Sequence, residues 1–275
     1  HNGEFNTIQG NINWMRARET DLADPAFGDD LEALKPIIND PEQSDTASVD
    51  NALELLLQTG RDLPHALRML IPEAWREDDQ MPPDRKAFYD YHASLVEPWD
   101  GPALVVGTDG DRIGAVLDRN GLRPCRYELT DDDRLVMASE AGALPTDPRH
   151  VTERGRLKPG QLFLADPEEG RVVPDDEVFD RLTDETYGNW VAEEQVALSD
   201  VVDESEPMGT LAPADPFRSH QATYGYTYDE LEKLIQPMMA EGKDPVGSMG
   251  DDTPLSVLSQ FNRPLFTYFK QLFAQ

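Results

Sequence analysis

Hydrophobic positions recur at helical spacing in several stretches of the first hundred residues. Apolar side chains three to four residues apart predict helices over 29–38, 48–58, 63–71 and 82–97, and a short helix or turn over 11–19. Within residues 11–19 we expect Trp14 and Met15 to pack inward, and Arg16 and Arg18 to pair with carboxylates. The first part of the chain is therefore predicted to be largely helical.

From Ala103 the apolar pattern changes to that of strands separated by turns. Three hairpins are predicted, each from two apolar runs and the polar turn between them: 103–107 with 112–117, 125–129 with 134–139, and 161–165 with 170–173. Successive hairpins make antiparallel sheet. Together with the preceding helices they predict an α+β fold.

The pattern weakens after the third hairpin. Residues 184–222 are polar and contain prolines, so we interpret them as a linker or crossing segment. Thr227 and Glu230 then have the spacing of a capping box before an apolar helical face over 231–239. A glycine-rich loop at 247–254 precedes a helix over 255–259, but it lacks the Walker lysine and contains two Asp, which excludes nucleotide binding.

The chain is strongly acidic. It has 54 Asp and Glu against 24 Lys and Arg, a net charge of −30, which disfavours nucleic acid and anionic membranes as partners. The acids are spread through patterned segments, as in cytoplasmic proteins of halophilic organisms, where salt screens their repulsion. No apolar run approaches a membrane span. The 39% of hydrophobic residues are sufficient for a sizeable core.

The first stretch, His1 to Thr7, is polar and too irregular for a strand. The Asn2 amide and the Gly3 backbone N–H are two neutral donors without bulk between them, and such donors stabilise the oxyanion of acyl transfer. An Asn-Gly pair alone is also a common turn signal. The residues by themselves leave both interpretations open.

Other reactive side chains have simpler structural interpretations. Ser44 and Asp45 precede a helix and have the composition of a cap. The lone cysteine, Cys125, lies in a strand pattern and is expected to be a buried structural thiol. His65 is expected to be a surface or helix histidine and His92 a packed one. The acids at 131–133 are expected to form a solvated hairpin tip, and no metal site is predicted.

Longer strings carry a more specific signal. Residues 1–7 with 10–19, 89–102 and 117–124 resemble the glutaminase part of the glutamate synthase large subunit, and 225–227, 247–255 and 268–275 resemble its central domain. The resemblance implies an N-terminal-nucleophile-type four-layer αββα sandwich. It implies that Asn2 and Gly3 form the oxyanion hole, that Asp45 binds the α-amino group of glutamine, with Ser44 as a weaker candidate, and that 117–124 shapes the pocket.

The resemblance also implies a domain organisation. Residues 1–183 would be the C-terminal part of a type 2 glutamine amidotransferase domain, 184–222 a linker, and 223–275 the start of an α/β central domain. The chain is then expected to be a fragment, inactive alone because the nucleophilic N-terminal Cys lies upstream. FMN and the iron–sulfur cluster are expected in the downstream part and no cofactor in this segment.

The implied function is glutamine amide hydrolysis that supplies ammonia for glutamate synthesis from 2-oxoglutarate. Glutamine, the rest of the synthase chain, and an electron-donating subunit or ferredoxin are the implied partners. Two alternatives stay open. One is another type 2 glutamine amidotransferase, of the purine-pathway or asparagine-forming kind, against which 225–275 argues. The other is a non-catalytic acidic interaction module, against which the regular helix and hairpin patterns argue.

Overall fold

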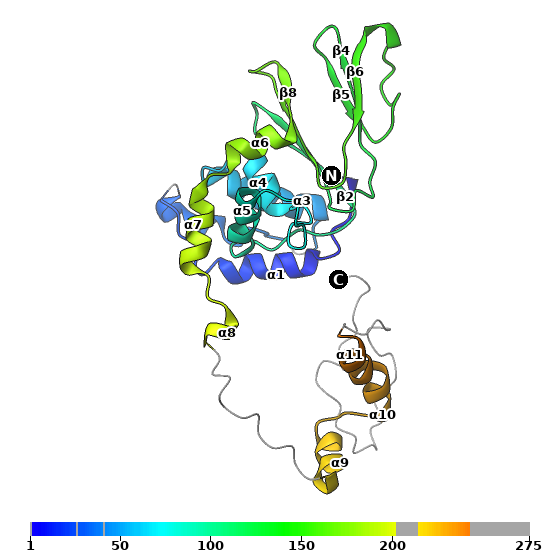
Figure 1. The fold of residues 1–275 in the computed structure, drawn as a ribbon. Coiled ribbons are helices and arrows are strands. Elements are labelled where there is room, and N and C mark those ends of the chain that lie inside the picture. The colour runs from blue at the N-terminus through cyan, green and yellow to red at the C-terminus, as the bar shows by residue number, and fades with distance from the viewer. Residues whose placement is uncertain (1, 26, 41, 202–213, 243–275) are drawn as a thin grey trace. The chain divides into compact units, whose positions relative to one another are not determined.

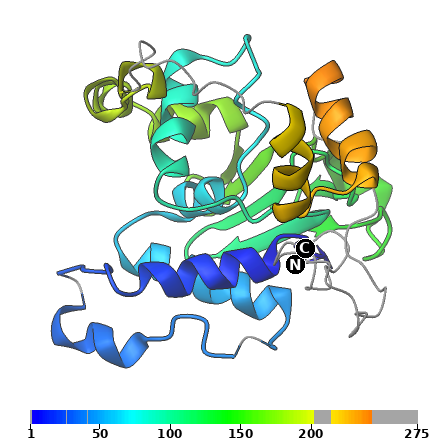
Figure 2. The ribbon, with the colours of Figure 1, turned by 90° about the horizontal axis from the view of Figure 1, so that it is seen from below.

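A computed structural model of the chain describes residues 2–25, 27–40, 42–201 and 214–242. The chain divides into two units, 1–195 and 196–275, each described by itself. The first contains two antiparallel sheets with the helices gathered on one side (Figures 1 and 2).

The larger sheet has five strands in the order β1-β2-β3-β7-β8. Their bounds are β1 Asn2–Gly3, β2 Ala103–Thr108, β3 Ile113–Leu117, β7 Leu162–Asp166 and β8 Arg171–Val173. Each neighbouring pair is antiparallel, and the short β1 places Asn2 opposite Leu104 and Gly3 opposite Ala103. Asn2 and Gly3 thus form an edge strand of this sheet, so the expectation that residues 1–7 are too irregular for a strand is wrong for these two residues.

The smaller sheet has three strands in the order β5-β4-β6. They are β4 Arg126–Thr130, β5 Leu135–Ala138 and β6 Val151–Arg156. The three predicted hairpins are confirmed as β2–β3, β4–β5 and β7–β8. Strand β6 was not predicted, because its sequence Val-Thr-Glu-Arg-Gly-Arg contains one apolar residue in six.

The helices of the first unit lie mainly before the sheets in sequence. They are α1 Ile8–Arg18, η1 Gly28–Asp30, α2 Leu31–Leu34, α3 Asp45–Gln58, α4 Leu63–Leu70, α5 Pro83–Ala93, η2 Pro148–His150, α6 Asp175–Leu182 and α7 Glu185–Glu194. Helices α3, α4 and α5 confirm three predicted helices with shifted ends. Helix α5 ends at Ala93, where the prediction ran to 97.

Two hydrophobic cores lie on opposite faces of the larger sheet. Val105, Val116 and Leu164 belong to the cluster shared with the helices. Their neighbours Leu104, Leu117 and Phe163 belong to a second cluster with Cys125 and Leu157, beside the smaller sheet. Adjacent strand residues point to opposite faces, so both faces are apolar because both are covered. The described part of the first unit is α+β, as predicted.

Two further predictions near the N-terminus are wrong. The helix predicted over 29–38 ends at Leu34, because Pro36 disfavours helical geometry at Lys35, which is extended with φ −85° and ψ 137°. Trp14 is 54% exposed, although Met15 is buried as expected. Arg18 pairs with Glu97, as anticipated, and its guanidinium also lies over the Trp14 ring.

The weakly patterned stretch 184–222 contains structure that was not predicted. Helix α7 packs against α5 through Tyr187 and Trp190, whose rings lie 5.3 and 5.1 Å from that of Tyr91. The division into 1–183, 184–222 and 223–275 stays a prediction.

The second unit contains α8 Leu198–Val201, α9 Ala214–Thr223, α10 Tyr228–Glu230, η3 Leu231–Ile235 and α11 Gln236–Glu241. The predicted capping box of Thr227 and Glu230 is confirmed. The predicted loop at 247–254, the helix over 255–259 and the aromatic stretch to Gln275 lie outside the described residues.

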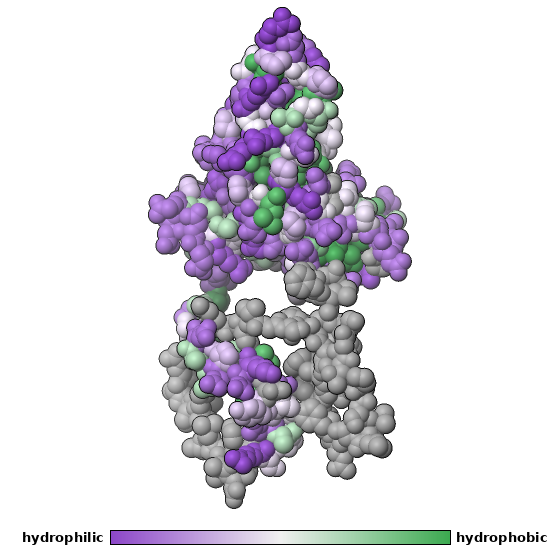
Figure 3. All heavy atoms as spheres, turned by 90° about the vertical axis from the view of Figure 1, so that its right-hand side faces the viewer, coloured by the Kyte–Doolittle hydropathy of each residue, from purple (hydrophilic) through white to green (hydrophobic). Residues whose placement is uncertain are grey.

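Hydrophilic side chains cover most of the visible surface of the first unit (Figure 3). Arginines there are largely engaged with carboxylates, for example Arg171 and Arg181, which share Glu169 and Glu177. Acidic residues nevertheless outnumber basic ones in the chain by 54 to 24.

Candidate functional site

The Asn2–Gly3 segment has a backbone geometry that only glycine fits at its second position. Gly3 has φ +139°, and a Cβ placed there would lie 1.9 Å from the carbonyl oxygen of Pro102. Such an overlap excludes any side chain without movement of the backbone. The structure therefore explains Gly3 sterically, independently of any role for its N–H.

A second glycine, Gly101 in the segment before β2, constrains the same close approach of the two backbones from the other side. Gly101 has φ +153°, and a Cβ there would lie 2.2 Å from the carbonyl oxygen of Glu4. The Glu4 N–H donates to Pro102 O at 3.3 Å, and the Thr7 N–H donates to Asp100 O at 3.3 Å. The segment carrying Asn2 and Gly3 is thus held along the segment that leads into β2.

Asp45 is brought to this segment from 40 residues away. It is the first residue of α3, is half-buried, and its Oδ2 accepts the Phe5 N–H at 2.7 Å. Phe5 is itself buried, with its ring edge-on to Trp99. Three of the four predicted site residues, Asn2, Gly3 and Asp45, therefore lie at one end of the larger sheet.

Ser44 is the helix cap that its sequence context allowed. Its hydroxyl accepts the Ala47 N–H at 3.3 Å at the start of α3, and the residue is exposed. Capping satisfies one of the four unpaired N–H groups of the first turn. The cap orients the helix that carries Asp45, and this geometry accounts for Ser44 without a substrate contact.

The loop 117–124 contacts the place where the N-terminal segment lies along the segment before β2, as its predicted role in shaping the site requires. Asp118 is buried and accepts the N–H groups of Ala103, Asn120 and Gly121 at 2.9–3.2 Å. Arg119 pairs with Asp100, the residue that also bonds Thr7. The Arg123 Nε donates to Pro102 O at 3.2 Å, the carbonyl that also accepts the Glu4 N–H.

The resemblance pointed to the loop 117–124 as a part of the site, but the sequence did not indicate the contacts that its residues make, because these contacts are remote in sequence. Asp100 contacts Thr7 across 93 residues, and Arg123 reaches Pro102 across 21. The available signal was the local density of Asp, Arg, Asn and Gly in 117–124. Those residue types predicted a turn but could not indicate which segment the turn would hold.

Cys125 does not have the environment of a nucleophile. Its side chain is buried in the inter-sheet core, and burial raises the pKa of the thiol to about 11. A thiol with this pKa is almost fully protonated at neutral pH, whereas the thiolate is the reactive form. The interpretation as a structural thiol is supported.

His65 and His92 form a pair that the sequence did not indicate. Their Nε2 atoms lie 2.8 Å apart, and burial lowers the pKa of each ring to about 4. His92 Nδ1–H donates to Phe88 O at 2.7 Å, so the neutral His92 accepts at Nε2 from the His65 Nε2–H. The pair is uncharged at neutral pH and joins α4 to α5.

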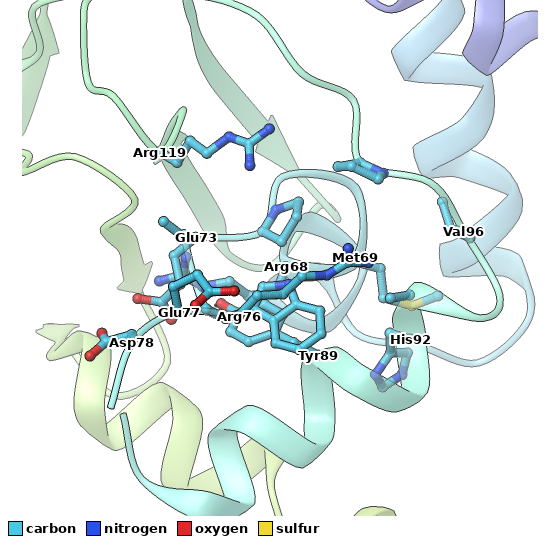
Figure 4. Close-up of a pocket in the computed structure, with 15 residues that line it drawn as sticks. Arg68, Met69, Glu73, Arg76, Glu77, Asp78, Tyr89, His92, Val96 and Arg119 are labelled. Carbon is cyan, nitrogen blue, oxygen red and sulfur yellow. Dashed lines mark hydrogen bonds between the residues drawn. The ribbon is translucent and has the colours of Figure 1, made fainter. Parts of the chain in front are cut away.

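A cavity of about 650 Å³ opens beside this helix pair and is lined by Glu73, Trp75, Tyr89 and Arg119 among others (Figure 4). Arg68 at its base is fully buried, donates to Gly160 O and pairs with Asp175. Glu73 accepts from Tyr89 at 2.9 Å and from Arg85 at 2.6 Å. This network of ion pairs ties α4, α5 and α6 together, so we assign it a structural role.

The described ranges contain neither a cluster of metal ligands nor a membrane-spanning helix. Among these residues, no group of three or more His, Cys, Asp or Glu side chains is arranged to hold a metal ion. In the same part of the chain, no helix has the length and apolarity needed to cross a membrane.

Comparison with known proteins matches both parts of the chain. The family model for class-II glutamine amidotransferases matches residues 1–190, and the model for the glutamate synthase central domain matches residues 219–275. This agrees with the predicted N-terminal-nucleophile type of α+β fold.

Full-length relatives are much longer than this chain. The whole chain is 47% identical to the glutamate synthase [NADPH] large chain of Bacillus subtilis, 43% to the ferredoxin-dependent glutamate synthase 2 of Arabidopsis thaliana and 42% to the glutamate synthase [NADH] of Saccharomyces cerevisiae. It covers 18%, 17% and 13% of those proteins, respectively. The family match over 1–190 shows that the chain belongs to the class-II glutamine amidotransferases.

Proposed function

We propose that this chain is part of a glutamate synthase, in which it takes part in glutamine amide hydrolysis that supplies ammonia for glutamate synthesis from 2-oxoglutarate. The match of 219–275 to the glutamate synthase central domain favours this enzyme over purine-pathway and asparagine-forming amidotransferases. The 40–47% identity to glutamate synthases over the whole chain supports the same choice.

The observation that carries the proposal is the placement of Asp45 against the Asn2–Gly3 segment. The bond from the Phe5 N–H to Asp45 Oδ2 holds a carboxylate at Phe5, which is two residues after Gly3 and three after Asn2, the proposed oxyanion donors. An enzyme acting on glutamine needs donors for the amide oxygen and an anion for the α-ammonium group, because the two groups lie at opposite ends of one substrate. This arrangement argues against a purely non-catalytic acidic module.

The proposed chemistry follows from these groups. A thiolate attacks the amide carbon of glutamine, and the negative charge that develops on the amide oxygen is stabilised by the Asn2 amide and the Gly3 N–H. Collapse of this intermediate, with a proton delivered to the nitrogen, releases ammonia and leaves a thioester. Water then hydrolyses the thioester to glutamate and restores the thiol. Because Cys125 is buried and protonated, we propose that an N-terminal cysteine of the longer enzyme supplies the thiolate.

We also propose the setting in which the enzyme works. The charge of −30 supports a cytoplasm rich in salt, as in a halophilic organism. The electron donor of the complete enzyme is proposed to be an associated subunit or ferredoxin, in line with the names of the NADPH-, NADH- and ferredoxin-dependent relatives.

The test compares Asn2→Ala with Asp45→Asn in the complete enzyme. Asn2→Ala removes a hydrogen-bond donor that stabilises the oxyanion, which forms only beyond the ground state. Glutaminase kcat should therefore fall about 10²–10³-fold with little change in KM. Asp45→Asn weakens a contact present in both the ground and transition states, so KM for glutamine should rise more than kcat falls.

Ser44→Ala is the matched control at the same helix start. It should lower the free energy of unfolding by about 1 kcal/mol, because the helix cap is lost, and leave kcat and KM near their wild-type values. An Asn2→Ala enzyme with unchanged turnover and weaker glutamine binding would show that the oxyanion assignment is wrong.

A further inference from the structure

A cavity of about 330 Å³ between residues 121–126 and 156–159 gathers positive charge. Four cationic side chains, Arg123, Arg126, Arg156 and Lys158, are among those that line it. The chain has only 24 Lys and Arg against 54 Asp and Glu. A concentration of cations in one cavity therefore runs against the composition of the whole molecule.

Two of these arginines occupy directly facing positions in the smaller sheet. Arg126 of β4 lies opposite Arg156 of β6 in the antiparallel ladder. Side chains at facing positions project to the same side of the sheet with their Cβ atoms about 5 Å apart, and like charges there are destabilising. Arg126 and Arg156 therefore repel each other across the two strands, and both residues are exposed, so solvent and salt partly screen this repulsion.

Among the described residues, no carboxylate forms an ion pair with Arg126 or Arg156; Glu128, two positions along β4 from Arg126, pairs with Arg154 instead. Arg134, Arg149 and Arg154, close in sequence, pair with Asp132, Asp147 and Glu128. Among the described contacts, Arg126, Arg156 and Lys158 have no such ion pair, although acids are abundant. The same sheet therefore neutralises the arginines outside the cavity and leaves those at its wall unneutralised.

The walls are held in place by the rest of the fold. Cys125 and Leu157 are buried in the inter-sheet core, and the Leu157 N–H donates to Cys125 O at 3.1 Å. Gly121 has φ +60° and lies against Pro159, which a Cβ would approach within 2.7 Å. Arg123 is fixed by its bond to Pro102 O. A cavity with fixed walls requires little ordering when a ligand binds.

We propose that this cavity binds a small anion with at least two negative charges, presented as carboxylate or phosphate oxygens. Guanidinium groups suit such oxygens because they donate paired, charge-assisted hydrogen bonds. A bound dianion would turn the repulsion between Arg126 and Arg156 into two attractions. Asn2 and Asp45 are not among its lining residues, although the cavity shares residues 121–124 with the loop beside the candidate glutamine site. The inference does not depend on the proposed glutaminase role.

The test titrates the purified 275-residue chain with inorganic phosphate, 2-oxoglutarate or glutamate, using calorimetry and thermal unfolding. Potassium chloride holds the ionic strength constant, so general screening does not change during a titration. At least one dianion should bind saturably and raise the Tm, since a ligand of the folded state stabilises it. A stronger response to phosphate or to 2-oxoglutarate tells which oxyanion the site prefers.

Arg126→Gln and Arg156→Gln should each weaken that binding by at least about tenfold, since each removes a charge-assisted bond. Without ligand, neither variant should be less stable than wild type, because each relieves the cross-strand repulsion. Arg149→Gln is the matched control: it removes one exposed arginine near the same sheet but outside the cavity, and should keep wild-type affinity.

Two results would overturn the proposal. One is a response to the dianions no larger than that to chloride. The other is that Arg126→Gln and Arg156→Gln bind the dianion as tightly as Arg149→Gln does but have a lower Tm. The two arginines would then stabilise the fold and not bind the anion.

Discussion

Gly3 and Gly101 show how single residues determine the geometry of the candidate site. Each has a positive φ, and each faces a carbonyl of the other segment at a distance that leaves no room for a methyl group. The Asn2–Gly3 segment, which we propose to carry the oxyanion donors, is therefore positioned by close backbone approach and not by packed side chains. This constraint belongs to the residue and its φ, and it exists whether or not Gly3 also contributes its N–H to catalysis.

Gly3→Ala should destabilise the fold by about 1–3 kcal/mol from backbone strain alone, with the overlap on Pro102 O adding to it. Gly10→Ala is the matched control, because Gly10 lies in α1 with open space around its Cβ position. That change should stabilise the chain by up to about 1 kcal/mol through helix propensity. Urea unfolding gives the change in the free energy of unfolding for each variant. Equal changes for Gly3→Ala and Gly10→Ala would contradict the steric argument.

The His65–His92 pair makes a second prediction at this scale. Burial lowers the pKa of both rings to about 4, so between about pH 4 and pH 6.5 the unfolded state binds more protons than the folded state. Stability should therefore be retained above pH 6.5 and fall as the pH is lowered through this window. His150 has the opposite sign, because its hydrogen bond to Asp131 raises its pKa.

The measurement is the urea midpoint at about pH 7 and about pH 5.5, where most carboxylates stay ionised. The double variant His65→Gln/His92→Gln should lose much of the decrease seen in wild type. His150→Gln is the control and should not reduce the decrease. A double variant with the wild-type pH dependence would contradict the assignment of a neutral buried pair.

At the scale of elements, the sequence predicted those helices and hairpins that are determined by the local pattern of apolar and turn residues. The three hairpins and helices α3, α4 and α5 follow from apolar periodicity and turn residues. Strand β6 and helix α7 do not, because β6 is nearly all polar and α7 depends on aromatic contacts with α5 across about 100 residues. For the candidate site, Asn2, Gly3, Asp45 and the loop 117–124 were found through resemblance, while the contacts of Asp118, Arg119 and Arg123 became apparent only in the structure.

Arg68 carries a prediction about how elements are joined. It lies in α4, is fully buried, and bonds Gly160 before β7 and Asp175 at the start of α6. Arg68→Ala leaves Asp175 without this partner and opens a void, so it should cost about 3–5 kcal/mol. Arg149→Ala breaks an exposed pair that water screens, so its cost should be much smaller. Chemical denaturation compares them, and a loss for Arg68→Ala as small as the control would refute a structural role.

At the scale of the whole molecule, charge and fold act against each other. The ion pairs described above place arginines between carboxylates, yet 54 acids cannot be neutralised by 24 basic residues. The excess repels itself in the folded state more than in the expanded unfolded state, because folding brings the charges closer. Local pairs such as Arg171 with Glu177 therefore reduce the cost of compaction without removing it.

The folded state should consequently gain stability when salt screens this repulsion. From dilute buffer to about 1 M KCl the Debye length falls to about 3 Å, shorter than the spacing of most surface charges. Salt also weakens the exposed ion pairs, but each of these contributes at most about 1 kcal/mol. With a net charge of −30, the loss of repulsion should exceed the loss of attraction, so the Tm should rise with KCl.

Circular dichroism melting across a KCl series measures this balance, and a sucrose series of equal osmolality is the control. Sucrose is excluded from the protein surface and stabilises folded states without screening charge. KCl should raise the Tm more than sucrose does, with most of the gain at low salt, where the Debye length changes fastest. A Tm that stays flat or falls as KCl is added would show that attraction between paired charges outweighs the repulsion, and the salt-adapted interpretation of this composition would then be wrong.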